Sequence, residues 1–245
     1  MRAGPARILL ATLAMLPGSG AWSQPQGSEL NLSFLLASDY KHNGLSATAS
    51  GPVARFAADY EHQSGFFAGG FLANVEYYAE RYYKTPRDYQ VNVYAGYIRR
   101  GTTWTTSVSA SRYVYPGISF RYDYTQLAVN ASFRDRLFFG AGHSDNFLSI
   151  DRTAYHYHAG VALPAKWDLE IGINAGRFRS SELFGTEYSF WDIGVSRALR
   201  RFAFDLRYHD NTYDRSTILG DGGGDRWVLS VAYALAPSGR SARAR

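Results

Sequence analysis

This chain contains two histidines, His156 and His158, whose spacing would suit metal ligands. Because they are two positions apart, both side chains would lie on the same face of a β-strand. A pair of imidazoles can hold zinc or copper, but such sites normally contain further protein ligands. No third ligand is identifiable in the sequence. We therefore interpret His156 and His158 as residues that line an interior, and we predict no metal site and no cofactor.

The segment GDGGGD (residues 220–225) combines aspartates with glycines, as calcium-binding loops do. It lacks the alternating oxygen ligands and the positioned glutamate of such a loop. Glycines in an external loop need no ligand to explain them, so we predict a flexible loop here. The chain also contains no cysteine, which excludes disulfides, thiolate metal sites and a cysteine nucleophile.

A serine hydrolase would need a serine hydroxyl within hydrogen-bonding reach of a histidine. His143 and Ser144 are adjacent, so on a strand their side chains point to opposite faces. The predicted strands contain no H-x-S or S-x-H sequence, although a pairing across two strands stays open. We therefore predict no catalytic residues and no enzyme. An outer-membrane hydrolase is the least favoured alternative.

Charged residues recur on the polar faces of the predicted strands, where a dry core could not hold them unpaired. We predict that they line the lumen of a barrel. The predicted lumen residues are Arg55, Asp59, Glu61, Glu76, His156, His158, Glu170, Asp192, Asp205, Arg207 and Arg226. With Asp88, Asp168 and Arg201 added, the set holds eight acidic and four basic residues, a formal charge of −4. Such a wall would weakly favour cations or neutral polar solutes over anions.

The elements that position these residues are strands, because apolar residues alternate with polar ones at a period of two. In the segment 88–99, Tyr89, Val91 and Val93 share one face, opposite Asp88 and Gln90. A helix would need a period near 3.6, which no segment shows. The twelve predicted strands are 29–38, 52–62, 65–77, 88–99, 103–114, 123–133, 136–145, 153–163, 167–177, 187–197, 201–210 and 225–235.

The connections between these strands alternate between short and long. Short examples are QS (63–64) and RD (134–135), and long ones are DYKHNGLSATASG (39–51) and NTYDRSTILGDGGG (211–224). Short turns at one rim, long external loops at the other and an even strand number are typical of outer-membrane β-barrels. A tilted strand of about ten residues spans a bilayer, and closure of the sheet satisfies every backbone group. The predicted fold class is therefore all-β, an up-and-down antiparallel transmembrane β-barrel of about 12 strands.

Aromatic residues near the strand ends fit this interpretation. Tyrosine and tryptophan are enriched where a membrane meets water, and they form girdles around outer-membrane barrels. The residues that we assign to such girdles are Tyr89, Tyr97, Trp104, Tyr155, Trp167, Trp191 and Trp227. A soluble antiparallel sandwich would also alternate, but its inner face would carry bulky aliphatic residues rather than glycine, serine, asparagine and charges.

The N-terminal segment has the features of a secretory signal peptide. Arg2 and Arg7 precede an apolar run at 8–16, which is too short to span a bilayer. Small residues that suit a cleavage site follow this run. We predict that residues 1–23 are cleaved and that the chain reaches the outer membrane of a Gram-negative cell through the Sec pathway and periplasm.

The barrel domain is predicted at residues 24–236, and a basic disordered tail at 237–245. The net charge of +5 comes from the two ends of the chain, which together carry five arginines. The body between them is formally neutral, so we predict no nucleic-acid partner. The predicted partners are outer-membrane lipid and small polar solutes or ions.

Several segments resemble the Gcw_chp family, also called the TorF porin family. They are SDYKHNGLS (38–46), DYEHQSGFFAGGFLANVEY (59–77), VNVYAGY (91–97), YPG (115–117), DYTQLAVNAS (123–132), SFWDIGVSRAL (189–199) and RWVLSVAYAL (226–235), and they occur in the family's order. In the first segment, His42 replaces an aromatic residue of the family pattern and Asn43 replaces an arginine. The resemblance implies a signal peptide, an outer-membrane β-barrel and a pore function, and it brings no catalytic residues.

Together these features predict a porin, an outer-membrane channel for passive diffusion of small hydrophilic solutes. Twelve strands lie between eight-stranded barrels, which side chains fill, and sixteen- to eighteen-stranded channels. The predicted lumen is therefore narrow, and a loop that folds inward could close it. A non-conducting outer-membrane barrel with a surface binding or envelope-structural role is the principal alternative.

Overall fold

The computed structural model describes residues 28–76, 78–79, 83–84, 88–117, 123–149, 152–180, 187–214 and 222–237. The predicted signal peptide and almost all of the predicted tail lie outside these ranges. The barrel strands are β1 (Glu29–Ala37), β4 (Val53–Glu61), β5 (Phe66–Val75), β8 (Asp88–Arg100), β9 (Trp104–Val114), β10 (Tyr124–Phe133), β11 (Leu137–Ser144), β12 (Ala154–Pro164), β13 (Leu169–Ser180), β14 (Glu187–Leu199), β15 (Phe202–Asn211) and β16 (Arg226–Pro237).

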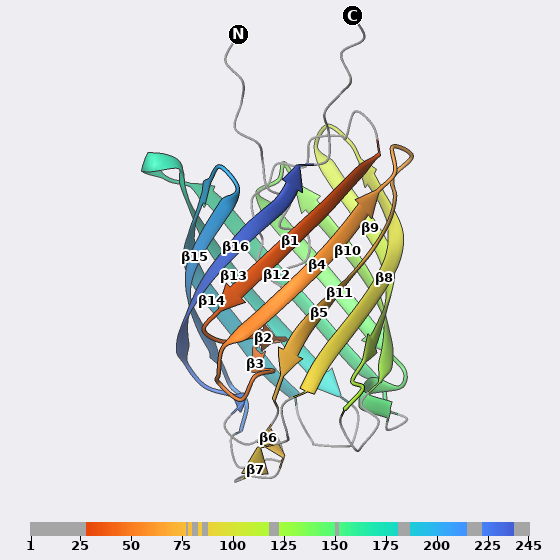
Figure 1. Ribbon diagram of the computed structural model, residues 1–245, viewed down its shortest axis with the longest axis vertical. Coiled ribbons are helices and arrows are strands. Elements are labelled where there is room, and N and C mark those ends of the chain that lie inside the picture. The colour runs from red at the N-terminus through yellow and green to blue at the C-terminus, as the bar shows by residue number, and fades with distance from the viewer. Residues whose placement is uncertain are drawn as a thin grey trace, which may run out of the picture.

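These strands form one closed barrel in which each pairs with its neighbours in the chain order (Figure 1). The barrel closes where β1 pairs with both β4 and β16, and every pairing is antiparallel. One register shift lies at the closing seam, between Leu32 and Ser33. The structure confirms the prediction of an up-and-down barrel of twelve strands, and β1 begins at the same rim where β16 ends.

The two faces of the wall differ in chemistry because the side chains of a strand alternate between them. On β9 and β10 the outward residues Val108, Leu127 and Val129 are each more than half exposed. The inward residues of β9 include Ser107 and Ser109, and those of β14 include Asp192. An apolar outer band around a polar interior is the arrangement that a bilayer requires of a barrel.

The short connections are tight because successive residues adopt left-handed backbone conformations. Arg134 and Asp135 have φ values of 51° and 52°, so β10 turns directly into β11. Trp167 and Asp168, with φ values of 61° and 57°, belong to a short 3-10 segment, η2 (Lys166–Asp168), which joins β12 to β13. Mirror-image turns of this kind match the twist of antiparallel strands, which explains connections of so few residues.

At the opposite rim the loops carry structure that the alternation did not predict. The segment 38–52 forms a hairpin of β2 (Lys41–His42) and β3 (Leu45–Ser46), and it lies inside the barrel rather than outside. This corrects the prediction of an external loop at 39–51. Two further short strands, β6 (Tyr78–Ala79) and β7 (Tyr83–Lys84), pair beyond the barrel end, and a 3-10 segment, η1 (Phe147–Ser149), follows β11. Within the described ranges, no helix is long and apolar enough to cross a membrane.

Candidate functional site in the barrel lumen

The segment 38–52, which we call the inner hairpin, is held in shape by one buried carboxylate. Asp39 is 2% exposed, and its Oδ1 accepts hydrogen bonds from Ser46 Oγ at 2.5 Å and Thr48 Oγ1 at 2.9 Å. The Lys41 ammonium lies 3.3 Å from the other carboxylate oxygen. Charge-assisted hydrogen bonds of this kind are stronger than neutral ones. The hairpin therefore has a defined fold of its own within the lumen.

Side chains of β14, β15 and β16 attach the inner hairpin to the wall. Arg226 Nη1 donates to the Ser50 carbonyl at 2.9 Å, and Asn211 Nδ2 donates to the Gly44 carbonyl at 3.0 Å. Gly44 has a φ of +81°, and a Cβ there would lie 2.4 Å from Cβ of Phe190. Position 44 therefore requires glycine. Any other residue would be strained at this φ, and its Cβ would collide with the Phe190 side chain.

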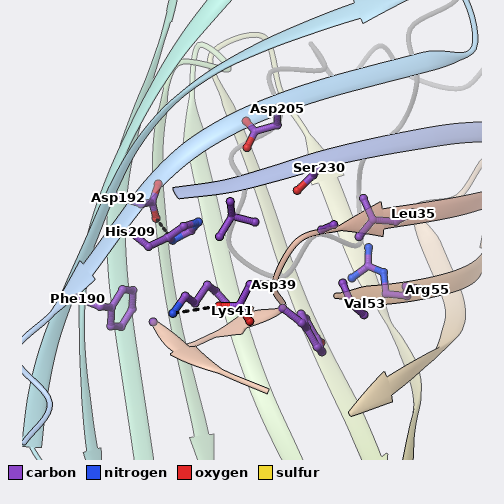
Figure 2. Close-up of a pocket in the computed structure, with 14 residues that line it drawn as sticks. Leu35, Asp39, Lys41, Val53, Arg55, Phe190, Asp192, Asp205, His209 and Ser230 are labelled. Carbon is purple, nitrogen blue, oxygen red and sulfur yellow. Dashed lines mark ion pairs between the residues drawn. The ribbon is translucent and has the colours of Figure 1, made fainter. Parts of the chain in front are cut away.

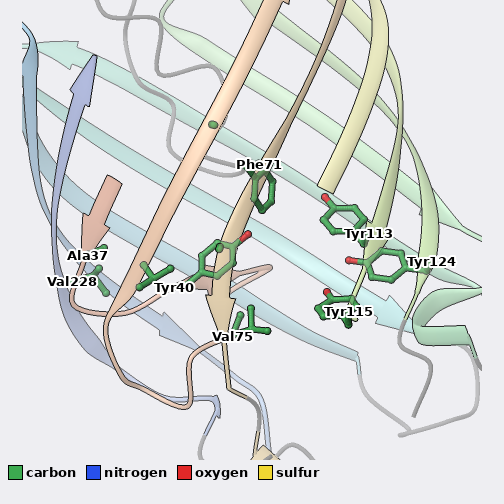
Figure 3. Close-up of a cluster of buried hydrophobic side chains, with 12 residues drawn as sticks. Ala37, Tyr40, Phe71, Val75, Tyr113, Tyr115, Tyr124 and Val228 are labelled. Carbon is green, nitrogen blue, oxygen red and sulfur yellow. The ribbon is translucent and has the colours of Figure 1, made fainter. Parts of the chain in front are cut away.

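The opposite side of the inner hairpin packs against tyrosines of β9 and β10 (Figure 3). His42 Nε2 is 3.3 Å from the Tyr124 hydroxyl, and the His42 ring lies 5.7 Å from that of Tyr113. The Tyr113 and Tyr124 rings stack at 4.6 Å. Burial lowers the pKa of His42 to about 4, because the imidazolium form would lose its water there.

Aromatic residues of another loop complete the closure at this end. Phe147 of η1 packs against both buried apolar clusters of the lumen, and its ring lies 4.9 Å from Tyr124 and 5.3 Å from Phe178. The buried aromatic residues of the two clusters are Tyr40, Phe71, Tyr113, Tyr115, Tyr124, Phe178, Tyr188, Phe190 and Tyr213. Apolar contacts thus extend across the loop end of the lumen, where an open channel would hold water.

A cavity of about 50 Å³ remains between the inner hairpin and the wall (Figure 2). Charged and titratable residues on its lining come from both sides: Asp39, Lys41, Arg55, Asp192, Asp205 and His209. A volume of this size holds a few water molecules. The cavity is therefore a small remnant of the lumen with both charged and apolar residues on its lining, and it is too small for an organic solute.

Three of the predicted lumen residues form one buried ionic cluster on β14 and β15. Arg207 lies 2.5 Å from Asp192 and 3.0 Å from Asp205, and the side chains of Arg207 and Asp192 are 2% and 4% exposed. Asn174 donates a further hydrogen bond to Asp192 at 2.7 Å. Arg207 compensates most of the charge of the two carboxylates, and the cluster is buried, so it is poorly placed to attract a passing ion.

The other charged residues of the prediction are spread over several strands, except Glu76, which directly follows β5. Arg55 is buried, and its guanidinium lies 5.0 Å from the Phe71 ring centre in a cation–π contact. Asp59 accepts a short hydrogen bond from Tyr94, and the backbone N–H of Glu76 donates to the Ala47 carbonyl of the inner hairpin. Glu170 is half-buried near the start of β13.

Glu61 has a partner outside the predicted lumen set, since Arg100 forms a double hydrogen bond with it. The side chain of Arg100 is 7% exposed. Asp168 and Arg201, which the charge count included, lie instead in exposed turns. With Asp168 and Arg201 removed and Arg100 added, the predicted lumen set has four basic and seven acidic residues, a formal charge of −3.

His156 and His158 lie side by side on β12, with ring centres 6.3 Å apart and nearly parallel planes. Glycines on β11 leave room for them, because a Cβ at Gly140 would meet His158 at 2.3 Å and one at Gly142 would meet His156 at 2.1 Å. Among the residues that the structure describes, no group of three metal-binding side chains occurs.

A serine and a histidine do approach each other in one turn of the chain. His62 Nδ1 and Ser64 Oγ are 2.7 Å apart, but both lie in the exposed turn between β4 and β5. The Ser64 backbone N–H also points at the same nitrogen at 3.2 Å, so the contact belongs to the turn geometry. His143 packs against Tyr155, whereas Ser144 is buried on the opposite face.

The inward face of β9 is more accessible than that of β14. The inward residues Thr105, Ser107, Ser109 and Ser111 are half-buried, whereas the inward residues Tyr188, Phe190 and Asp192 of β14 are buried. The accessible part of the inner wall is therefore rich in hydroxyl groups, and the closed part is aromatic and ionic.

A closed twelve-stranded barrel with an apolar outer band, a polar inner wall and a loop folded into its lumen defines a porin-type β-barrel. A family model described as "Bacterial protein of unknown function (Gcw_chp)" matches residues 23–233. The chain belongs to this family, which confirms the resemblance seen in the sequence.

Solved structures with a similar fold are outer-membrane porins. The KdgM porin has a TM-score of 0.53 and 11% identity, over 85% of this chain and 99% of that chain. The NanC porin has a TM-score of 0.51 and 13% identity, over 84% of this chain and 100% of that chain. A KdgM complex with disordered oligogalacturonate has a TM-score of 0.52 and 9% identity, over 85% and 99% of the two chains. No curated protein matches the sequence.

Proposed function

We propose that this protein is an outer-membrane channel for the passive diffusion of small hydrophilic solutes, and that the inner hairpin closes it at the loop end. The proposal rests on one observation, the inward fold of residues 38–52 across the lumen of a closed barrel. Signal-peptide cleavage after residue 23 and export through the Sec pathway belong to the same proposal. N-terminal sequencing of the mature protein tests that part.

The chemistry of the accessible wall supports small polar solutes rather than apolar ones. Half-buried serine and threonine side chains along β9 offer hydrogen bonds to water and to hydroxylated solutes. The KdgM porin has been solved with oligogalacturonate, a polyanion. Here the buried Arg207 and Arg100 are each paired with carboxylates, so these two cations are not free to bind a polyanion.

The inner-wall charge supports weak selectivity. A formal charge of −3 favours cations over anions, but ion pairs and burial reduce its effect on the pathway. We therefore propose a small cation preference, measurable as a reversal potential in a salt gradient. Enzymatic activity is not part of the proposed function, because the approach of His62 to Ser64 lies in an exposed turn.

A second candidate, a non-conducting barrel with a surface binding or envelope-structural role, is favoured by the aromatic clusters at the loop end. The two candidates differ in whether the hairpin ever leaves the lumen. A channel must have a state in which the hairpin is displaced, whereas a structural barrel needs none.

Single-channel conductance in a planar bilayer separates the candidates. The test compares the wild-type protein with Gly44→Ala, whose added Cβ would meet Phe190 at 2.4 Å and so displaces the hairpin. Gly51→Ala is the matched control in the same loop, where the nearest atom to an added Cβ, the Thr48 carbonyl oxygen, is 3.1 Å away. We expect larger or more frequent conductance steps in Gly44→Ala than in the other two proteins.

Conductance steps that appear only in Gly44→Ala would mean that the wild-type channel is closed when the hairpin is docked. If all three proteins insert and fold, as judged by heat-modifiable migration, and none of them conducts, the channel proposal is wrong and the structural role stands. A lipid-hydrolysis assay on the same preparations tests the remaining alternative, the outer-membrane hydrolase.

A further inference from the structure

The rim of short turns carries basic side chains around most of its circumference. Six exposed basic residues lie in or beside four of the five turns, and we call them the basic rim: Arg99, Arg134, Arg136, Lys166, Arg200 and Arg201. The acidic residues of the same turns are Asp135 and Asp168. The rim therefore has an excess of positive charge that the formally neutral body of the chain does not predict.

The basic rim is not neutralised within the protein. In the described part of the chain, none of its six residues takes part in an ion pair. At the opposite, loop end, exposed arginines do have partners, since Arg112 lies 3.6 Å from Asp123 and Arg177 lies 2.7 Å from Glu187. Among the described residues of the loop end, Arg179 is also exposed without an ion pair, but six such cations gather at the turn end, and this excess indicates an anionic partner there.

The basic rim lies next to outward-facing aromatic residues, which places it at the level of lipid headgroups. Trp104 and Phe133 pack with ring centres 5.0 Å apart at the turn end of β9 and β10. The Arg134 guanidinium is 5.2 Å from the centre of the Phe133 ring, and Trp167 is 77% exposed beside Lys166. Aromatic residues settle at the membrane–water boundary, and neighbouring arginines and lysines extend from there toward phosphates.

We infer that the basic rim binds the phosphate groups of anionic phospholipids in the leaflet on the side of the short turns. Guanidinium groups form bidentate hydrogen bonds with phosphate oxygens, and a basic segment at a membrane surface is attracted to anionic lipid. The distribution of the six residues over four turns fits a ring of lipids around the barrel better than one compact partner. The inference rests on the proposal that the barrel spans a membrane.

The test measures which lipids stay with the folded barrel. The protein is reconstituted in nanodiscs that contain phosphatidylcholine with a minor fraction of phosphatidylglycerol, and the lipids retained after mild detergent extraction are counted by mass spectrometry. Arg134→Gln/Arg136→Gln/Arg200→Gln removes three charges from the basic rim. Arg112→Gln/Arg177→Gln/Arg179→Gln removes three charges from the loop end and serves as the matched control.

We expect several-fold enrichment of phosphatidylglycerol around the wild-type protein and the control, and little enrichment around the rim variant. Enrichment around the wild type should also fall when the salt concentration rises from about 0.1 M to about 1 M, because salt screens exposed charges. This salt series needs no variant, so it tests the inference even if the rim variant fails to fold.

Equal enrichment of phosphatidylglycerol around the rim variant and the control would overturn the inference. Enrichment around the wild type that does not change with salt concentration would also overturn it. Loss of binding to purified peptidoglycan by the rim variant, without any change in retained lipid, would overturn it in favour of a cell-wall partner. Failure of the wild-type protein to insert at all would instead contradict the membrane-spanning proposal, so the two failures are distinguishable.

Discussion

Arg207 holds two buried carboxylates at once, and its removal would leave Asp192 and Asp205 without their common partner. Breaking a buried ion pair by removing one partner is strongly destabilising, because an uncompensated charge remains in a poorly solvated site. We expect Arg207→Met to lower the free energy of unfolding by about 3–5 kcal/mol. Urea unfolding of the reconstituted protein, followed by heat-modifiable migration, measures this loss.

Two comparisons make this result specific. Arg177→Gln breaks an exposed pair with Glu187, in which both side chains are at least 40% exposed, and should cost less than about 1 kcal/mol. Adding Asp192→Asn and Asp205→Asn to Arg207→Met removes the orphaned charges and should recover much of the stability. If the single and triple variants are equally unstable, the cluster stabilises the barrel through packing and not through charge.

At the residue scale, the sequence predicts the face on which a charge lies but not its partner. Alternation assigned Asp192 and Arg207 to the polar face of their strands, and the structure finds both side chains buried there. Arg100 was missed because the predicted strand ends at residue 99 and leaves Arg100 in the turn, whereas β8 extends to Arg100. Partners such as Glu61, 39 residues away, are set by strand register.

At the element scale, the inner hairpin should respond to pH through His42. The pKa of His42 is about 4 when the hairpin is docked, below its ordinary value of 6.5, so the docked state binds fewer protons than an undocked one. The docked hairpin therefore has its full stability above about pH 6.5, and this stability decreases as the pH falls toward 4. The difference between the two pKa values of His42 corresponds to about 3 kcal/mol of docking free energy.

Trypsin cleavage after Lys41 measures this change, because the Lys41 side chain is 7% exposed in the docked hairpin. We expect cleavage, measured at each pH and normalised to an unstructured trypsin substrate at the same pH, to be slow at pH 7 and to accelerate progressively as the pH falls. His42→Phe keeps an aromatic ring among Tyr40, Tyr113 and Tyr124 but cannot be protonated. Acceleration that persists in His42→Phe would assign the pH response to another group.

The inward fold of the hairpin could not be derived from the segment alone. Its composition, with glycine, asparagine and several serines, is that of an external loop, and its burial depends on residues elsewhere in the chain. Asn211, for example, is 167 residues away from Gly44. The prediction that a loop could close a narrow lumen followed from barrel width, but the choice of loop depended on contacts that only the structure shows.

At the scale of the whole molecule, the outer and inner faces of one strand should tolerate charge very differently. Val108 faces outward at the middle of β9 and is 54% exposed, whereas its neighbour Ser109 faces the lumen. A lysine on the lipid face near the bilayer midplane costs about 2–4 kcal/mol in a barrel. We expect Val108→Lys to lose stability by this amount and Ser109→Lys to lose much less.

The two lysine variants are compared by their urea midpoints after insertion into vesicles. Equal losses would mean that the outer surface of the barrel does not contact lipid at this level. A larger loss of stability for Ser109→Lys would mean that the inner face is the one shielded from water, which would contradict the membrane-spanning arrangement.

The barrel as a whole was predictable because each strand carries its own signal. Every predicted segment coincides with an observed strand to within a few residues, as β10 (Tyr124–Phe133) does with the expected 123–133. The alternation is enforced along each strand by lipid on one side and polar groups on the other. The small strands β2 and β3 have only two residues each, too few to show a period.

The position of the inner hairpin in the chain has a consequence for biogenesis. It joins the first two barrel strands, yet it is attached through Phe190, Asn211 and Arg226, which are synthesised long after it. Ser38, at its base, also exchanges hydrogen bonds with Leu229 of the last strand, at 2.9 Å and 3.1 Å. The docking site of the hairpin is therefore incomplete until the final strands arrive, although the tyrosines of β9 and β10 that also contact it are synthesised earlier. A nascent barrel would pass through a stage in which the hairpin is only partly attached.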